Sequence, residues 1–267
     1  MIGYLDLPSG ISGDMWLGCI LDCGWDLDRL REVIKKLGML FDDWSIETRQ
    51  VQKGALRATQ VDVKIRDPEK KNDSIEYHPD GNSHHHAYCS SQNLNVANRN
   101  LTDIFGIIDG SLLPGKIKAT SKLVFERLAE AEAKVHGISV NRVHFHEVGA
   151  VDAIIDIVGT VAGIYELGIE KLYASALPLS RGWTKSQHGI IPLPAPATLE
   201  ILASVSAPTI PALGYGELVT PTGAALLCQM AEFRLPFMCI KRIGTGAGKA
   251  DFLWPNIARL WIGQEEQ

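Results

Sequence analysis

Residues 3–23 read GYLDLPSGISGDMWLGCILDC: an apolar run, a loop of glycine and hydroxyl residues, and a second apolar stretch. Gly3 to Leu7 predicts a short buried strand, and Met15 to Cys23 predicts a helix that ends at Gly24. A strand followed by a polar loop and a helix is typical of α/β proteins. Because Glu217 to Ala225 repeats this order, we expect a mixed sheet flanked by helices.

The rest of the chain alternates between helical and strand patterns. Asp26 is expected to cap a helix over residues 27–37, and residues 44–52 and 56–65 alternate as a hairpin. Further helices are predicted over residues 101–108, 116–136, 152–167 and 197–203. Further strands are predicted over residues 143–147, 171–179, 237–243 and 257–262, and turns over residues 189–197 and 244–248. The predicted fold class is therefore α/β, or mixed α+β.

Three segments are expected along the chain. Residues 1–65 hold the first strand, loop and helix together with the hairpin. Residues 66–100 contain few hydrophobic side chains and no periodicity, which predicts a long, disordered, histidine-containing surface loop. Residues 101–267 form the main α/β segment, and we expect it to pack with residues 1–65 as one domain.

Composition narrows the classes of function. The net charge of −5 argues against a general nucleic-acid binder, which needs a basic face. No basic segment precedes an apolar one at the N-terminus, and Asp156 interrupts the longest apolar run. We therefore expect no signal peptide, no membrane span and a cytoplasmic location. The five cysteines lack CxxC spacing, so neither a disulfide framework nor a zinc knuckle is expected.

Two imidazoles and three carboxylates lie close together between residues 144 and 156. If residues 143–147 form a strand, its period of two places His144 and His146 on one face, beside Glu147. In the helix that follows, Asp152 and Asp156 are four residues apart and share a face. These residue types are metal ligands or acid and base groups, and a carboxylate buried among isoleucines needs a cation, a proton or hydrogen-bond donors. The alternative is a pair of structural histidines and a capping aspartate.

The loop before the first helix has the composition of an anion cradle. Ser9, Gly10, Ser12 and Gly13 offer hydroxyls and close backbone approach at a helix N-terminus. Asp14 would repel a phosphate unless a cation lay between them, and Asp6 at the end of the strand offers this cation a second carboxylate. The alternative is an ordinary N-cap formed by Ser12 or Asp14. No Walker motif or dinucleotide fingerprint is present.

Two further motifs could bind ligands. Thr220 and Thr222 place hydroxyls at another helix start, although a capped helix is the simpler explanation for them. His84, His85 and His86 form a short tract in the long loop, and neutral imidazole suits late divalent metals such as nickel. A flexible tract fixes no geometry, so it would concentrate or deliver a metal, or else simply be solvated.

Taken together, these motifs resemble the LarC family of nickel-insertion proteins, which belong to the lactate racemase cofactor pathway. The resemblance runs nearly end to end. It rests on Asp6 to Met15, the histidine tract, Ala131 to Gly137, Val143 to Asp152, His188-Gly189, Pro192 to Thr198, Glu217 to Ala225, Gly246 to Gly248 and Pro255-Asn256.

The resemblance implies a nickel-inserting cyclometallase of the chelatase type. It would form the nickel-pincer nucleotide from pyridinium-3,5-bisthiocarboxylic acid mononucleotide, consume CTP, and pass the product to an apo-enzyme of the lactate racemase type. Members of the family continue into a C-terminal ferredoxin-like domain that holds CTP and a divalent metal. This sequence stops at Gln267, so we expect either the N-terminal half of a split or frameshifted gene, with the other half supplied in trans, or a truncated chain. A homo-oligomer is compatible with this.

The resemblance also suggests a role for each candidate residue. Substrate phosphate is expected at the glycine and hydroxyl residues of the two loops, namely Ser9, Gly10, Ser12, Gly13, Thr220 and Thr222. Nickel is expected at Asp6, His144, His146 and Glu147, with auxiliary binding at His84, His85 and His86. Proton transfer is expected at Asp14, Asp152 and Asp156. A non-catalytic nickel metallochaperone and, less favoured, a nucleotide-dependent hydrolase are the competing hypotheses.

Overall fold

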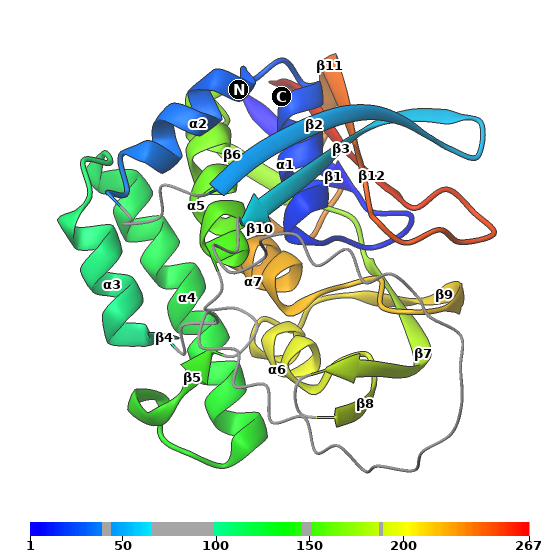
Figure 1. The fold of residues 1–267 in the computed structure, drawn as a ribbon. Helices are drawn as coiled ribbons and strands as arrows, with labels where there is room; N and C mark the ends of the chain where they lie inside the picture. Colours follow the sequence, from blue (N-terminus) through cyan, green and yellow to red (C-terminus); the bar gives the residue numbers. More distant parts are fainter. Residues whose placement is uncertain (39–43, 66–98, 146–150, 187–188, 267) are drawn as a thin grey trace, which may run out of the picture.

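A seven-stranded mixed sheet organises the protein, and a computed structural model describes residues 1–38, 44–65, 99–145, 151–186 and 189–266. The sheet draws strands from both ends of the chain in the order β10-β6-β1-β12-β11-β3-β2. Its members are β1 (Ile2–Asp6), β2 (Trp44–Lys53), β3 (Leu56–Ile65), β6 (Lys171–Ala174), β10 (Ala231–Glu232), β11 (Met238–Ala247) and β12 (Ile257–Glu265). β1 lies between β6, to which it is parallel, and β12, to which it is antiparallel (Figure 1).

Helix α1 (Gly13–Asp22) lies directly against this sheet. Close approach requires glycine on both sides, because a Cβ on Gly246 of β11 would collide with the backbone of Met15. A Cβ on Gly18 would likewise lie 2.5 Å from the carbonyl oxygen of Thr59. Glycine weakens the strand at Gly246, but its lack of a side chain allows the helix to pack closely on the sheet. The glycines of residues 244–247 lie within β11, so the turn predicted there is wrong.

The other helices form a layer outside α1, as Figure 1 shows. They are α2 (Leu27–Lys35), α3 (Leu101–Gly110), α4 (Gly115–His136), α5 (Val151–Glu166), α6 (Pro196–Ser204) and α7 (Pro221–Met230). α5 packs on α1, and α4 packs on α5, α6 and α7. Nearly every residue of α5 is buried, since it is covered from both sides. A carboxylate in the middle of α5 is thus held in an apolar layer.

Two small sheets complete the fold. β8 (Gly189–Leu193), β7 (Leu177–Ser186) and β9 (Thr209–Tyr215) form a three-stranded sheet in that order. β4 (Arg99–Asn100) pairs with β5 (His144–Phe145), which follows a 3-10 turn at Val140–Arg142. β6 and the start of β7 replace the single strand predicted over residues 171–179, and β8 occupies most of the turn predicted at 189–197. Residues 175 and 176 separate β6 from β7, which leaves the large sheet and pairs with β8 and β9.

The predicted fold class is confirmed, as are the hairpin β2–β3 and all six predicted helices, within one to three residues at each end. Of the strand predicted over residues 143–147, His144 and Phe145 pair with β4, whereas Val143 lies outside β5 and residues 146 and 147 lie outside the described residues. Residues 66–98 of the predicted loop lie outside the described residues, as do residues 146–150. Asn100 instead caps α3, and its side chain accepts a hydrogen bond from the Asp103 amide at 3.0 Å.

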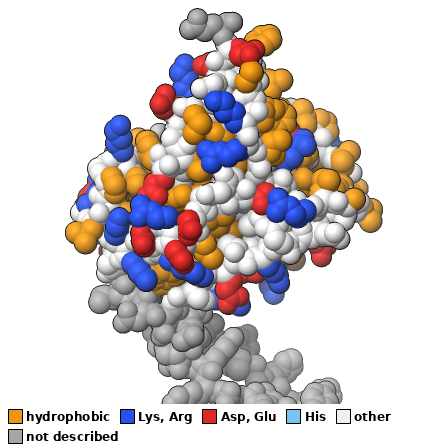
Figure 2. Space-filling model, turned by 90° about the horizontal axis from the view of Figure 1, so that it is seen from above, with side chains coloured by type: hydrophobic (Ala, Val, Ile, Leu, Met, Phe, Trp, Pro, Cys, Tyr) orange, Lys and Arg blue, Asp and Glu red, His pale blue; other side chains and the backbone are white. Residues whose placement is uncertain are grey.

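Surface properties agree with a charged globular chain. Figure 2 shows acidic and basic side chains interspersed over one face, with no field of a single sign among the coloured atoms. Hydrophobic side chains gather on one side of that face. Within the described ranges, no helix combines the length and apolar character that crossing a bilayer requires.

Candidate functional site

Two loops dock side by side where β1 ends. Ile11 and Val219 form a parallel bridge, in which the Ile11 amide donates to the Leu218 carbonyl at 2.9 Å. The Thr220 amide donates back to the Ile11 carbonyl at 3.1 Å. Gly10 has a φ of 82°, and a Cβ there would collide with the Leu218 carbonyl. The loops are locked together through their backbones, so α1 and α7 start next to each other.

Helix α5 starts at the same place. A Cβ on Gly13 would overlap the carboxyl group of Asp156, so glycine is what lets α1 begin against α5. The N-termini of α1, α5 and α7 border an open cavity of about 500 Å³, which we call the helix-end cavity. It is lined by Ser12, Gly13 and Asp14 of α1, Asp152 and Asp156 of α5, and Thr220, Pro221 and Thr222 of α7. Its size suits a nucleotide-sized ligand.

Asp14 has three polar neighbours in this cavity. The Ser12 hydroxyl donates to its carboxylate, and so does the Met15 amide, at 3.0 Å. The Lys249 ammonium lies 3.9 Å from its other oxygen. Ser12 occupies the N-cap position but makes no capping bond to the helix. The capping hydrogen bond expected from Ser12 is therefore absent, and its hydroxyl serves Asp14 instead.

Asp156 is the strongest electrostatic anomaly of the site. Its Oδ1 atom is buried and makes no hydrogen bond among the described residues. Burial raises the pKa of its carboxyl well above the usual range, and the nearby Asp14 and Asp152 carboxylates add to the rise, against a smaller opposing effect of Lys249. Asp152 itself is exposed and accepts a hydrogen bond from the Ala153 amide at 2.9 Å. Three carboxyl groups thus converge where a proton or a cation would relieve them.

The second loop contributes hydroxyls. Thr220 caps α7 by accepting a hydrogen bond from the Gly223 amide at 3.2 Å, and Thr222 lines the cavity from the first turn of the helix. A helix N-terminus carries backbone amides that lack an intrahelical acceptor and a partial positive charge. The starts of α1 and α7 therefore offer an anion two such ends, beside the carboxylates.

Three of the candidate residues lie elsewhere. The Ser9 hydroxyl is buried and donates to the Pro255 carbonyl at 2.6 Å, so it holds the loop in place. Gly10 lies against the Leu218 carbonyl and allows the two loop backbones to approach each other. The carboxylate of Asp6 is paired with Arg259 on β12, whose Nε donates to it at 2.7 Å, and it does not line the helix-end cavity.

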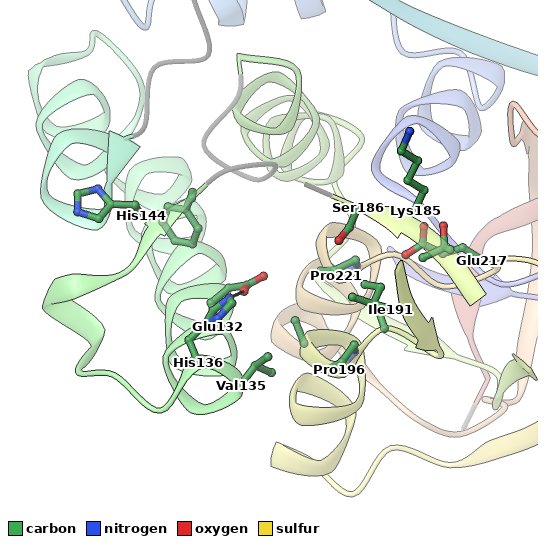
Figure 3. A pocket seen from close by; sticks show the side chains of 14 residues that line it. Glu132, Val135, His136, His144, Lys185, Ser186, Ile191, Pro196, Glu217 and Pro221 are labelled. Atoms are coloured by element: carbon green, nitrogen blue, oxygen red, sulfur yellow. Dashed lines mark ion pairs between the residues drawn. The ribbon is translucent and has the colours of Figure 1, made fainter. Parts of the chain in front are cut away.

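A second cavity adjoins the first. It measures about 120 Å³ and lies between α4 and the β7–β8 hairpin; we call it the α4–β8 cleft (Figure 3). Glu132 and His136 of α4 line one side, with their Oε2 and Nε2 atoms 3.4 Å apart. Glu217 and Pro221 line both cavities. Figure 3 shows the His144 imidazole directed away from Glu132 and His136.

Several of the expected metal ligands belong to segments that the structure does not describe. His84, His85, His86, His146 and Glu147 all lie outside the described residues, as does His188. Within the part of the chain that is described, no group of three or more His, Cys, Asp or Glu side chains has the geometry of a metal site. Asp6 and His144 in particular do not meet the Asp14 cluster.

Two lysines were missed by the sequence analysis. Lys249 follows the glycines of β11 and lines the helix-end cavity opposite Asp14. Lys53 is almost fully buried and donates to the Ala250 carbonyl at 3.2 Å and to Asp251 at 2.5 Å, so it fixes the segment that carries Lys249. The glycine-rich stretch before Lys249 was the available signal. Nothing in the sequence marks Lys53, since a lysine at a hairpin turn is usually solvated.

Comparison with known proteins identifies the family. The model of the nickel insertion protein family matches residues 3–267. A pyridinium-3,5-bisthiocarboxylic acid mononucleotide nickel insertion protein of Desulfitobacterium hafniense (strain DSM 10664 / DCB-2) is 41% identical over 98% of this chain and 58% of its own length. A relative from Roseiflexus castenholzii, which carries the family's name, is 44% identical over 99% of this chain and 60% of its own length.

The chain thus spans about 60% of the length of the curated relatives it matches. No solved structure matches it. The family match covers the strand, loop and helix of the N-terminus, all of α5 and the segment that carries Lys249. On this evidence the chain belongs to the nickel insertion protein family.

Proposed function

We propose that this chain binds pyridinium-3,5-bisthiocarboxylic acid mononucleotide in the helix-end cavity and takes part there in the insertion of nickel. The observation that carries the proposal is the Asp156 carboxyl, whose Oδ1 atom is buried and makes no hydrogen bond to any described residue, and which meets Asp14 and Asp152 at three helix N-termini. The name of the Desulfitobacterium hafniense relative supports the choice of substrate. The cavity also has room for a mononucleotide.

The phosphate of the substrate would lie at the starts of α1 and α7. Backbone amides at Gly13 and the hydroxyl of Thr222 are the groups suited to it, because helix N-termini stabilise anions. Ser12 and Thr220 support the same ends by hydrogen bonding Asp14 and capping α7. Ser9 and Gly10 act through the loop backbone that places these groups.

Nickel, as the second substrate, would be received by the carboxylates on the other side of the cavity. Asp14 and Asp152 offer oxygen donors, and a divalent cation removes the repulsion among the three carboxyl groups. When nickel replaces a hydrogen on the ring carbon, one proton leaves. Asp156 is suited to accept that proton, because its raised pKa makes the carboxylate a stronger base. His144, with His146 and Glu147 close in sequence, is proposed to bring nickel to the cavity from the α4–β8 cleft.

The proposal also includes groups and partners outside the helix-end cavity. CTP and its divalent metal would bind to the C-terminal region that the resemblance implies, supplied in trans. The finished cofactor would pass to an apo-enzyme of the lactate racemase type. His84, His85 and His86 would concentrate nickel near the site.

Nickel binding by calorimetry tests the proposal. We expect the wild-type chain and the His84/His85/His86→Ala variant to bind one nickel ion more tightly when the mononucleotide is present. Asp14→Asn should lose this dependence on the mononucleotide, because Asp14 is a proposed nickel ligand, whereas Asp156→Asn should still bind nickel but fail to insert it. If all nickel binding disappears with the histidine tract and the mononucleotide has no effect, the chain is a metallochaperone and the proposal is wrong.

A further inference from the structure

We infer that the Glu132 and His136 side chains of α4 form a nickel entry site in the α4–β8 cleft, from which the ion passes to the helix-end cavity. This inference rests on the proposed function, since it assigns the route by which that function obtains its metal. Neither residue is among the candidates that the sequence analysis assigned to nickel. Four features of the cleft support the assignment.

The first is the geometry of the pair. Glu132 and His136 are four residues apart on α4, so they share a face of the helix. The Glu132 Oε2 and His136 Nε2 atoms lie 3.4 Å apart. Two donors that each bind a nickel ion at about 2.1 Å are about 3.0 Å apart when the angle at the ion is about 90°, as in the tetragonal geometry of nickel, so the observed separation has to close by only about 0.4 Å. The side chains can therefore chelate one ion with little movement.

The second feature is donor chemistry. Imidazole suits nickel among the late divalent metals, and a carboxylate supplies the negative charge that neutral imidazole lacks. Glu132 and His136 are close enough to share one ion, and among the described residues no third His, Cys, Asp or Glu completes a larger ligand group with them. Water would occupy the remaining positions. An ion held in this way exchanges readily, as a transfer site requires.

The third feature is the environment of the pair. Phe145, Val135 and Ile191 supply apolar walls around it. Phe145 is almost fully buried, so this wall is part of the core rather than a mobile surface. An apolar surround lowers the local dielectric constant and strengthens the attraction between a cation and Glu132. The side chains of Glu132 and His136 are 21% and 36% exposed, so an ion can still reach them from solvent.

The fourth feature is continuity with the reaction cavity. Glu217 and Pro221 line both the cleft and the helix-end cavity, so the two spaces are neighbours and these residues border both. Figure 3 shows Glu132 and His136 on one side of the cleft, with Glu217 and Pro221 across from them. The carboxylate of Glu217 thus stands at the junction, where it can attract a cation that leaves the pair. Beyond it lie Asp14 and Asp152.

The test uses the His84/His85/His86→Ala chain, which removes nickel binding by the tract. Nickel chloride is titrated into this chain and into three further variants of it: His136→Ala, Glu132→Gln and Glu130→Gln. Glu130 lies on the same helix and does not line the cleft, so Glu130→Gln is the matched control for loss of one carboxylate. Thermal melts without nickel check that each variant is folded.

We expect His136→Ala and Glu132→Gln each to weaken one nickel site by about tenfold or more, since each removes one of two protein ligands. Glu130→Gln should leave that site unchanged. Loading of nickel in the presence of the mononucleotide should slow in the two cleft variants at low nickel and recover at high nickel. Loss of an entry site thus raises the nickel concentration needed for half-maximal loading, whereas the maximal loading rate at high nickel is unchanged.

Two results would overturn the inference. One is nickel binding and loading that are unchanged in both cleft variants; the other is an equal loss in Glu130→Gln, which would show a general effect of surface charge. The mononucleotide dependence of nickel binding is read in the same titrations, and Asp14→Asn abolishes it if the proposed function holds. The inference can therefore fail while the proposed function stands, and the reverse outcome is also distinguishable.

Discussion

The Asp156→Asn substitution should stabilise the protein at neutral and alkaline pH. The folded carboxyl has a raised pKa, because it is buried, with no hydrogen bond to its Oδ1 from the described part of the chain, and because Asp14 and Asp152 lie nearby. In the unfolded chain the pKa of an aspartate is about 3.9. The folded state therefore holds its proton to higher pH than the unfolded state does.

The sign of the effect follows from proton linkage. Between the unfolded and folded pKa values the folded state binds more protons, so the free energy of unfolding falls as pH rises through this window. Below about pH 3.9 both states are protonated and the penalty vanishes. At pH values above the folded pKa, the free energy of unfolding is lower by about 1.4 kcal/mol for each unit by which the folded pKa exceeds the unfolded one. For a chain of this size, that corresponds to about 3–6 °C in melting temperature.

The assay is a series of thermal melts between pH 4 and pH 9 for the wild type, Asp156→Asn and Asp28→Asn. Asp28 is exposed on α2 and serves as the control for loss of one surface charge. Asparagine has the shape of aspartate, so it fits beside Gly13 as the carboxyl does. We expect the Asp156→Asn curve to rise above the wild type as pH increases and to meet it near pH 4. Parallel curves, or a variant less stable than wild type at pH 8, would refute the reasoning.

Three further predictions concern the walls of the helix-end cavity. Gly13→Ala should destabilise the chain by about 1–3 kcal/mol, seen as a lower urea midpoint, because the new Cβ overlaps the Asp156 carboxyl. Lys53→Met should expose residues 249–251 to proteolysis, since two carbonyls and Asp251 lose their donor, whereas Lys64→Met, at an exposed ion pair, should not. Thr222→Val should reduce the rise in melting temperature that inorganic phosphate produces in the wild type; an equal rise in both would place the anion elsewhere.

The local sequence pattern was sufficient to predict most of the helices and strands. The spacing of apolar residues predicted α1, α4 and α5, and Gly137 ends α4 with a φ of 63°, as a C-terminal glycine does. Where the prediction of strands failed, packing overrode the local signal. Glycine-rich residues 244–247 suggest a turn, but they form part of β11 because α1 needs their small size.

The candidate site was predicted in part. Asp14, Asp152 and Asp156 could be singled out because carboxylates in apolar surroundings are unusual, and the structure brings all three to one cavity with Thr220 and Thr222. Whether they bind nickel or transfer protons stays a prediction. Asp6 belongs to the same motif as Asp14, yet its carboxylate is held by Arg259, which is 253 residues away in sequence. Sequence spacing carries no information about such a partner.

The sequence by itself determined the fold class, the helices and the family, because these depend on periodicity, caps and motifs that are local or read in order. Only the tertiary structure decided which polar groups share a cavity. Ile11 and Val219 are bridged through their backbones, and this contact sets two helix N-termini beside the buried carboxyl of Asp156. Lys53 and Lys249 join them through contacts between distant segments. The pKa of Asp156 follows from that assembly, since burial and neighbouring charge exist only once the chain has folded.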